Sequence, residues 1–80
     1  MGIKNSVIVR IQELCAEKKI ALNTLANRAG ITPSTIYSML DEHRKDIGIV
    51  TLKKICDGLD ITIVDFFNTD YFITLEQELK

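Results

Sequence analysis

The chain has 80 residues, of which 46% are hydrophobic and 26% charged, and its formal net charge at pH 7 is −1. This length suits one small domain with a modest hydrophobic core. The sequence contains no apolar run near the roughly 20 residues that span a bilayer and no signal-peptide pattern at the N-terminus, so we expect a cytoplasmic protein without membrane contact.

Metal and cofactor chemistry has few candidate residues in this sequence. The two cysteines, Cys15 and Cys56, are far apart, and His43 is the only histidine. None of the spacings typical of a metal site occurs, so we expect no metal and no cofactor. We expect the cysteines to be buried, reduced thiols and His43 to lie in a loop, either in solvent or against a phosphate.

The charges are unevenly distributed along the chain. Through Cys56, nine basic residues accompany five acidic ones, which leaves a net charge of +4. From Asp57 onward, six acidic residues accompany one lysine, which leaves −5. A phosphate backbone would prefer the first part, so we expect the acidic end to point away from any nucleic acid, unless the asymmetry is an accident of a short chain.

The first predicted helix runs from about Val7 to Lys18. Asn5 or Ser6 can cap its N-terminus, because each side-chain oxygen can accept a hydrogen bond from a free backbone N–H of the first turn. Its inward apolar residues follow helical spacing: Val7, Ile8, Ile11, Leu14 and Cys15. We expect this helix to be scaffold.

Residues 22–40 are predicted to form two short helices joined by a tight turn. Gly30 can end the first helix, because glycine reaches the left-handed conformation without steric cost. Thr32 can cap the second helix, and Pro33 suits its first position because proline lacks the N–H that would be unpaired there. The inward residues of the two helices are Leu25, Ala26 and Ala29, then Ile36, Met39 and Leu40, with Ile31 filling the turn.

The other face of the second of these helices, from about Pro33 to Leu40, is polar. It carries Ser34, Thr35, Tyr37 and Ser38, followed by Asp41. Hydroxyl groups can bind base edges or phosphates, but no Arg, Asn or Gln is present to pair bidentately with guanine or adenine. The alternative is that this face is simply exposed to solvent.

A polar loop and two further helices follow. The loop carries Arg44 and Lys45 beside the polar helix, where they can bind a sugar-phosphate backbone. Thr51 is predicted to cap a helix from Leu52 to about Leu59, and Asp60 to end it in a left-handed conformation. Thr62 is predicted to cap a very short fifth helix that ends at Phe66 and Phe67.

From about Val7 through Phe67, the sequence resembles the helix-turn-helix domain of the phage repressor and Cro family, often called Xre-type. The resemblance rests on Ala26, Gly30, Ile36 and the segment GIVTLKKICDGLDITIVDFF from Gly48 to Phe67. It implies an all-α fold of about five helices, the lambda repressor-like DNA-binding domain. Family members often have Thr or Ser at the position of Ala21 and Gln at that of Leu22, so one phosphate contact of the family is absent from this pattern.

The function that this resemblance implies is sequence-specific binding of double-stranded DNA by a transcriptional regulator, a repressor, with its recognition helix in the major groove. The alternative is a protein-interaction module of the same fold, such as an antitoxin or adaptor. The sequence shows no catalytic nucleophile paired with a general base, no phosphate-binding glycine loop and no metal cluster, so we do not expect an enzyme. The candidate DNA-binding residues are Thr32, Pro33, Ser34, Thr35, Tyr37, Ser38, Arg44 and Lys45.

The sequence divides into a helix-turn-helix domain over residues 1–68 and a C-terminal extension over residues 69–80. The extension is rich in apolar residues, and Thr74 and Gln77 have the spacing of a capping box, which predicts a last turn or two of helix. It is a candidate homodimer interface, and folding back onto its own domain is the alternative.

Overall fold

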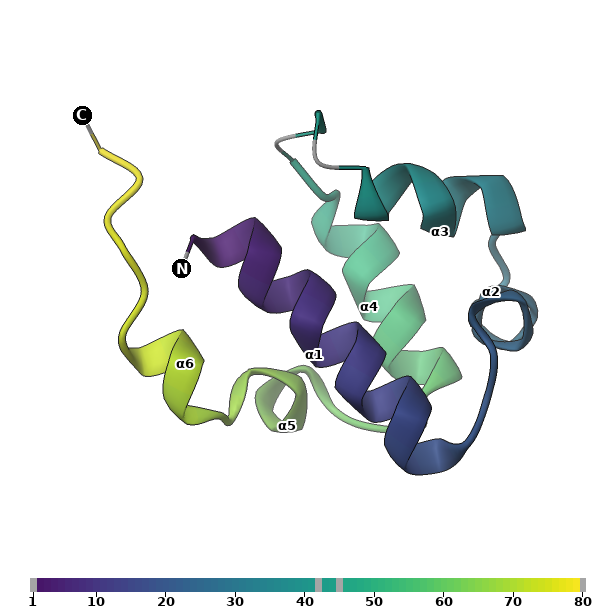
Figure 1. Ribbon diagram of the computed structural model, residues 1–80. Helices are drawn as coiled ribbons and strands as arrows, with labels where there is room; N and C mark the ends of the chain where they lie inside the picture. Colours follow the sequence, from purple (N-terminus) through teal and green to yellow (C-terminus); the bar gives the residue numbers. More distant parts are fainter. Residues whose placement is uncertain (1, 42, 45, 80) are drawn as a thin grey trace.

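The computed structural model describes residues 2–41, 43–44 and 46–79, and within these ranges the chain forms six α-helices and no β-strand (Figure 1). The all-helical prediction is therefore confirmed. The helices are α1 (Ile3–Lys18), α2 (Leu22–Ala29), α3 (Pro33–Leu40), α4 (Ile49–Gly58), α5 (Ile63–Phe67) and α6 (Asp70–Ile73). Among the described residues, no helix has the length and apolar character needed to cross a membrane.

The first five helices share one hydrophobic core. Each contributes a residue whose side chain is completely buried: Ile11, Leu25, Ile36, Ile55 and Phe66. Helix α2 packs most extensively against α4, and it also contacts α3. Burying apolar side chains of this size removes a large area from water, so the core is the main source of stability for these short helices.

The contact between α2 and α4 is close enough to involve the backbone. A Cβ atom added at Gly58, the last residue of α4, would lie 2.9 Å from the backbone nitrogen of Ala29 and 3.1 Å from its Cα. A side chain at position 58 would therefore push the two helices apart. Ala29 is the last residue of α2, so this contact brings the C-terminal ends of α2 and α4 together.

Two predicted helix starts were wrong. Helix α1 begins at Ile3 rather than Val7, with Gly2 as the N-cap, and Ser6 lies inside the first turn, where its buried hydroxyl donates to the carbonyl oxygen of Gly2 at 3.0 Å. Helix α4 begins at Ile49 rather than Leu52, with Gly48 as the N-cap. In both cases a glycine in an extended conformation precedes the helix, so the polar residue that was expected to cap it lies within a helical turn instead.

Several predicted helix boundaries are confirmed. The Oγ1 atom of Thr62 accepts a hydrogen bond from the N–H of Asp65 at 3.0 Å and so caps α5. Asp60 has the left-handed conformation, with φ at 58°. Lys19 also adopts this conformation after α1, with φ at 57°, which was not predicted from the sequence.

The C-terminal segment turns back along α1. Phe72 in α6 packs against Phe67, with 4.8 Å between the ring centroids, and the hydroxyl of Tyr71 donates to Glu13 Oε1 in α1 at 2.9 Å. Burial and this hydrogen bond raise the pKa of Tyr71.

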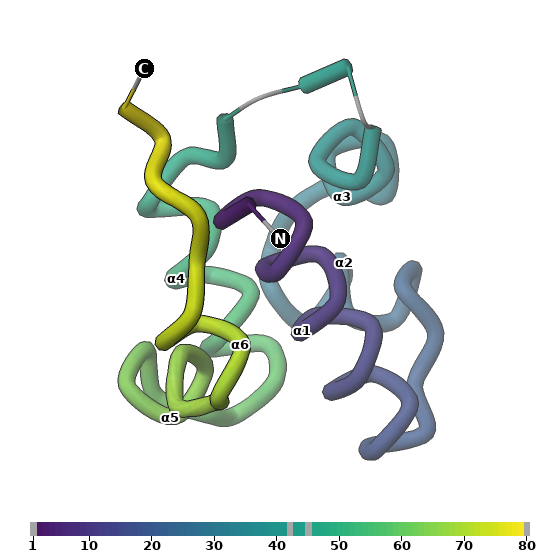
Figure 2. Tube along the Cα trace, turned by 60° about the vertical axis from the view of Figure 1, so that its left-hand side comes forward, coloured from purple at the N-terminus to yellow at the C-terminus, as the bar shows by residue number. Residues whose placement is uncertain are grey.

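Residues 75–79 are not helical and run toward the N-terminal end of α1 (Figure 2). The helix predicted after Thr74 was wrong, because Thr74 follows the end of α6.

The two cysteines are buried and free, as predicted. Burial raises the pKa of both thiols, and for Cys56 the nearby Lys53 lowers it and Asp57 raises it to smaller extents. A raised pKa leaves less thiolate at a given pH, so both side chains serve as small hydrophobic core residues.

Replacing Gly58 with alanine should lower the free energy of unfolding by about 1–3 kcal/mol, because the added methyl group collides with the backbone of Ala29. Gly48→Ala is a suitable control, since a Cβ there lies 3.5 Å from its nearest neighbour, Thr51 Oγ1, and only the capping preference changes, at under about 1 kcal/mol. Urea unfolding measures both changes. A Gly58→Ala variant no less stable than the control would contradict the close packing of α2 on α4.

Candidate nucleic-acid interface

The turn between α2 and α3 has the predicted structure. Gly30 adopts a left-handed conformation, with φ at 72°, and the N–H of Ile31 donates to the carbonyl oxygen of Ala26 at 3.0 Å. The Oγ1 atom of Thr32 then accepts a hydrogen bond from the N–H of Thr35 at 3.2 Å, and Pro33 occupies the first helical position. The chain therefore ends α2 and starts α3 within three residues, which fixes the direction of α3.

One face of α3 is held in the core and the other is presented outward. Ile36 and Met39 are buried, whereas the side chain of Tyr37 is 53% exposed. Ser34 is exposed, and Thr35 and Ser38 are half-buried. Tyr37 is thus a large side chain with a free hydroxyl end on a helix whose position is set by its opposite face.

The hydroxyl groups at the start of α3 lie close to one another. Thr32 Oγ1 is 3.1 Å from Ser34 Oγ and 2.9 Å from Thr35 Oγ1. Part of the hydrogen-bonding capacity of Thr32 and Thr35 is therefore used inside the protein. Tyr37 and Ser38, one turn further on, lie outside this cluster.

A hollow of about 230 Å³ lies between α3 and the start of α4. Its lining includes Thr35 and Ser38 from α3, together with Arg44 and Thr51. The fold thus brings three predicted site residues, Thr35, Ser38 and Arg44, to one place. Asp46 lines the same hollow and opposes the attraction of an anion. Lys45, another predicted site residue, falls outside the described residues.

The turn that carries Arg44 is closed by hydrogen bonds around Asp41. The N–H of Arg44 donates to the carbonyl oxygen of Asp41 at 3.0 Å, and the N–H of His43 donates to Asp41 Oδ1 at 2.9 Å. Lys4 in α1 reaches the same turn, where its Nζ donates to the carbonyl oxygens of Asp41 and Arg44. His43 itself is exposed.

Lys4 is a residue at this site that sequence reasoning missed. In the sequence it is one of nine basic residues that precede Asp57. No local pattern marks it, because its partners are 37 and 40 residues away along the chain.

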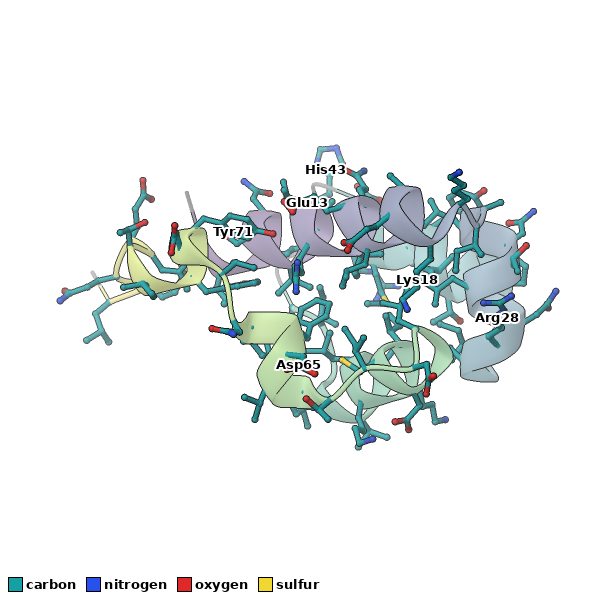
Figure 3. All side chains as sticks on the ribbon, turned by 90° about the horizontal axis from the view of Figure 1, so that it is seen from below. Glu13, Lys18, Arg28, His43, Asp65 and Tyr71 are labelled. Carbon is teal, nitrogen blue, oxygen red and sulfur yellow. The ribbon has the colours of Figure 1, made fainter. Side chains whose placement is uncertain are left out.

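The acidic part of the chain lies away from α3. Helices α5 and α6 lie at the opposite end of the molecule from α3 in Figure 1. In Figure 3, Asp65 and Tyr71 lie on these two helices, whereas Lys18 and Arg28 lie toward the end formed by α1 and α2. Asp57, Asp60 and Asp65 line a separate open hollow of about 600 Å³, where Asp57 pairs with Lys53. Within the described parts of the chain, no group of three or more His, Cys, Asp or Glu side chains could hold a metal ion.

Comparison with known proteins identifies the family. The crystal structure of prophage Lp1 protein 11 is similar to this chain, with a TM-score of 0.81 and 29% sequence identity over 90% of this chain and 96% of that one. No curated protein matches the sequence. Residues 10–70, well over half of the chain, match the profile of the Cro/C1-type HTH DNA-binding domain, and the chain therefore belongs to this family of helix-turn-helix DNA-binding domains.

Proposed function

We propose that the protein is a transcriptional repressor that binds a specific double-stranded DNA site with α3 in the major groove. The observation that carries this proposal is the orientation of α3, whose buried Ile36 and Met39 leave Tyr37 exposed on the outer face. A helix in this position of a helix-turn-helix can insert its outer side chains between the two phosphate backbones. Membership of a DNA-binding family supports the same conclusion.

The outer face of α3 favours readout by hydroxyl groups and one aromatic ring. Ser34, Ser38 and Tyr37 can donate hydrogen bonds to base acceptors or phosphates, and the Tyr37 ring can contact a thymine methyl group. None of them forms the bidentate pair by which arginine recognises guanine. We therefore expect moderate base selectivity, with much of the affinity coming from the backbone.

Arg44 is the proposed phosphate-binding residue beside α3, with its neighbour Lys45. Its side chain lines the hollow next to Ser38 and the beginning of α4, where free N–H groups of the first helical turn favour a negative charge. The cap of α4 is Gly48, which has no side chain to occupy that position. Asp46 would weaken this attraction in part.

The chain is proposed to act as a homodimer through its C-terminal segment, so that two copies of α3 read half-sites about 34 Å apart. The support is that the apolar residues of this segment are partly packed on the core and partly exposed. Phe72 packs against the core of its own chain, whereas Ile73 and Leu79 are 81% and 86% exposed. Pairing with a second copy would remove apolar surface of these two side chains from water, which favours association.

Replacing Tyr37 with alanine should weaken binding to the specific site by about tenfold while changing the free energy of unfolding by less than about 1 kcal/mol, because the ring is largely outside the core. Ser38→Ala should act in the same direction more weakly. Val64→Ala, an exposed position on α5, is the matched control and should leave binding unchanged. Equal affinities for the Tyr37 and Val64 variants in a fluorescence anisotropy titration would argue against α3 as the reading helix.

Arg44→Gln should weaken binding to all duplexes and reduce the slope of log K against log salt by about 1, because one phosphate contact is lost. Lys53→Gln removes the same charge from the far side of α4, where Lys53 pairs with Asp57, and is the control. Titrations at several salt concentrations compare the two. If the two variants have the same slope, the loop that carries Arg44 does not contact phosphate.

A further inference from the structure

We infer that Lys4 is a positioning residue for DNA binding: it holds the turn after α3 in the conformation that directs Arg44 toward phosphate. This inference rests on the proposed function and adds to it a residue of α1 that itself contacts no DNA. The turn begins at Asp41 and ends at Arg44. The guanidinium group of Arg44 is the one proposed to bind phosphate.

The ammonium group of Lys4 contacts both ends of the turn. Lys4 Nζ donates to the carbonyl oxygen of Asp41, at the start of the turn, and to that of Arg44, at its end. The turn also has its own hydrogen bond, from the N–H of Arg44 to the carbonyl oxygen of Asp41 at 3.0 Å. The internal bond closes the turn, and Lys4 attaches it to α1.

Electrostatics gives a reason for a cation at this place. The C-terminal end of a helix carries partial negative charge on carbonyl groups that have no partner within the helix. Helix α3 has no basic residue in its own last turn. Lys4 supplies that charge from α1, through its contact with the carbonyl oxygen of Asp41, the C-cap of α3.

Arg10, six residues further along α1, makes the same kind of contact with a different helix. Its Nε donates to the carbonyl oxygen of Phe66 at 2.8 Å and its Nη2 to that of Asp65 at 2.9 Å, at the C-terminal end of α5. Helix α5 carries no proposed DNA-binding residue. Arg10 is therefore a natural control for Lys4, because it has the same structural role at a helix that does not bear the site.

The first test uses the free protein. In Lys4→Met, which keeps the length of the side chain but removes its charge, the {¹H}–¹⁵N heteronuclear NOE of the His43 and Arg44 amides should fall, while core amides in α1 and α4 keep their values. Lys4→Arg retains a cationic donor and should restore the values at least in part. Arg10→Met should leave the His43 and Arg44 amides unchanged. If these amides are equally ordered in Lys4→Met and in the unsubstituted protein, the inference is overturned.

The second test is a double-mutant cycle with Arg44, measured by DNA affinity. Lys4→Met should weaken binding by about threefold to tenfold in the normal chain but by much less when Arg44 is already glutamine, because its effect passes through Arg44. Equal losses in both backgrounds would mean that Lys4 acts independently of Arg44 and would overturn the inference. Arg44→Gln with unchanged affinity would instead contradict the phosphate contact of the proposed function, and with it the DNA-binding part of this inference.

Discussion

The turn that leads into α3 begins at a close contact between Ala29 and Gly58. Because a glycine ends α4, the backbones of α2 and α4 come close enough that a Cβ at position 58 would lie 2.9 Å from a backbone nitrogen. Ala29 is the last residue of α2, and the left-handed Gly30 and the cap at Thr32 follow it in the chain. The direction of α3 is therefore set by packing on one side and by three residues of turn on the other.

Helix α1 stabilises the ends of the short helices. Helices of eight and five residues, such as α3 and α5, are not stable in isolation, so they depend on packing and on partners for their terminal carbonyl groups. Lys4 provides such a partner at α3 and Arg10 at α5. The helix that looked like plain scaffold in the sequence thus also fixes the loop from which Arg44 is proposed to contact DNA.

The features that the sequence predicted correctly are set by the conformation of one or two residues. Gly30, Thr32 and Thr62 each act within a few residues of chain, so their residue types are enough to place the turn and the caps. The starts of α1 and α4 were misplaced because Gly2 and Gly48 precede them, and glycine offers no side chain from which a cap can be recognised. Ser6 and Thr51 have side chains that suit an N-cap, but both residues lie within the helices, near their starts.

The candidate site also has features that one helix determines and features that depend on contacts between distant residues. The outward position of Tyr37 followed from the apolar spacing of Ile36 and Met39, which is a property of one helix. The gathering of Ser38 and Arg44 around one hollow, and the role of Lys4, depend on contacts between residues far apart in the chain. Such contacts leave no periodic pattern in a single sequence, so only the folded structure places them.

DNA binding by α3 is tested most directly by selecting bound duplexes from a random DNA pool. The affinity for the most enriched duplex is then measured at several salt concentrations. A DNA-reading dimer should enrich a short palindromic site and lose affinity steeply as salt increases, because phosphate contacts release counterions. A folded protein that enriches no site, or whose binding does not depend on salt, would contradict DNA binding by α3 and would point to a protein partner for its outer face.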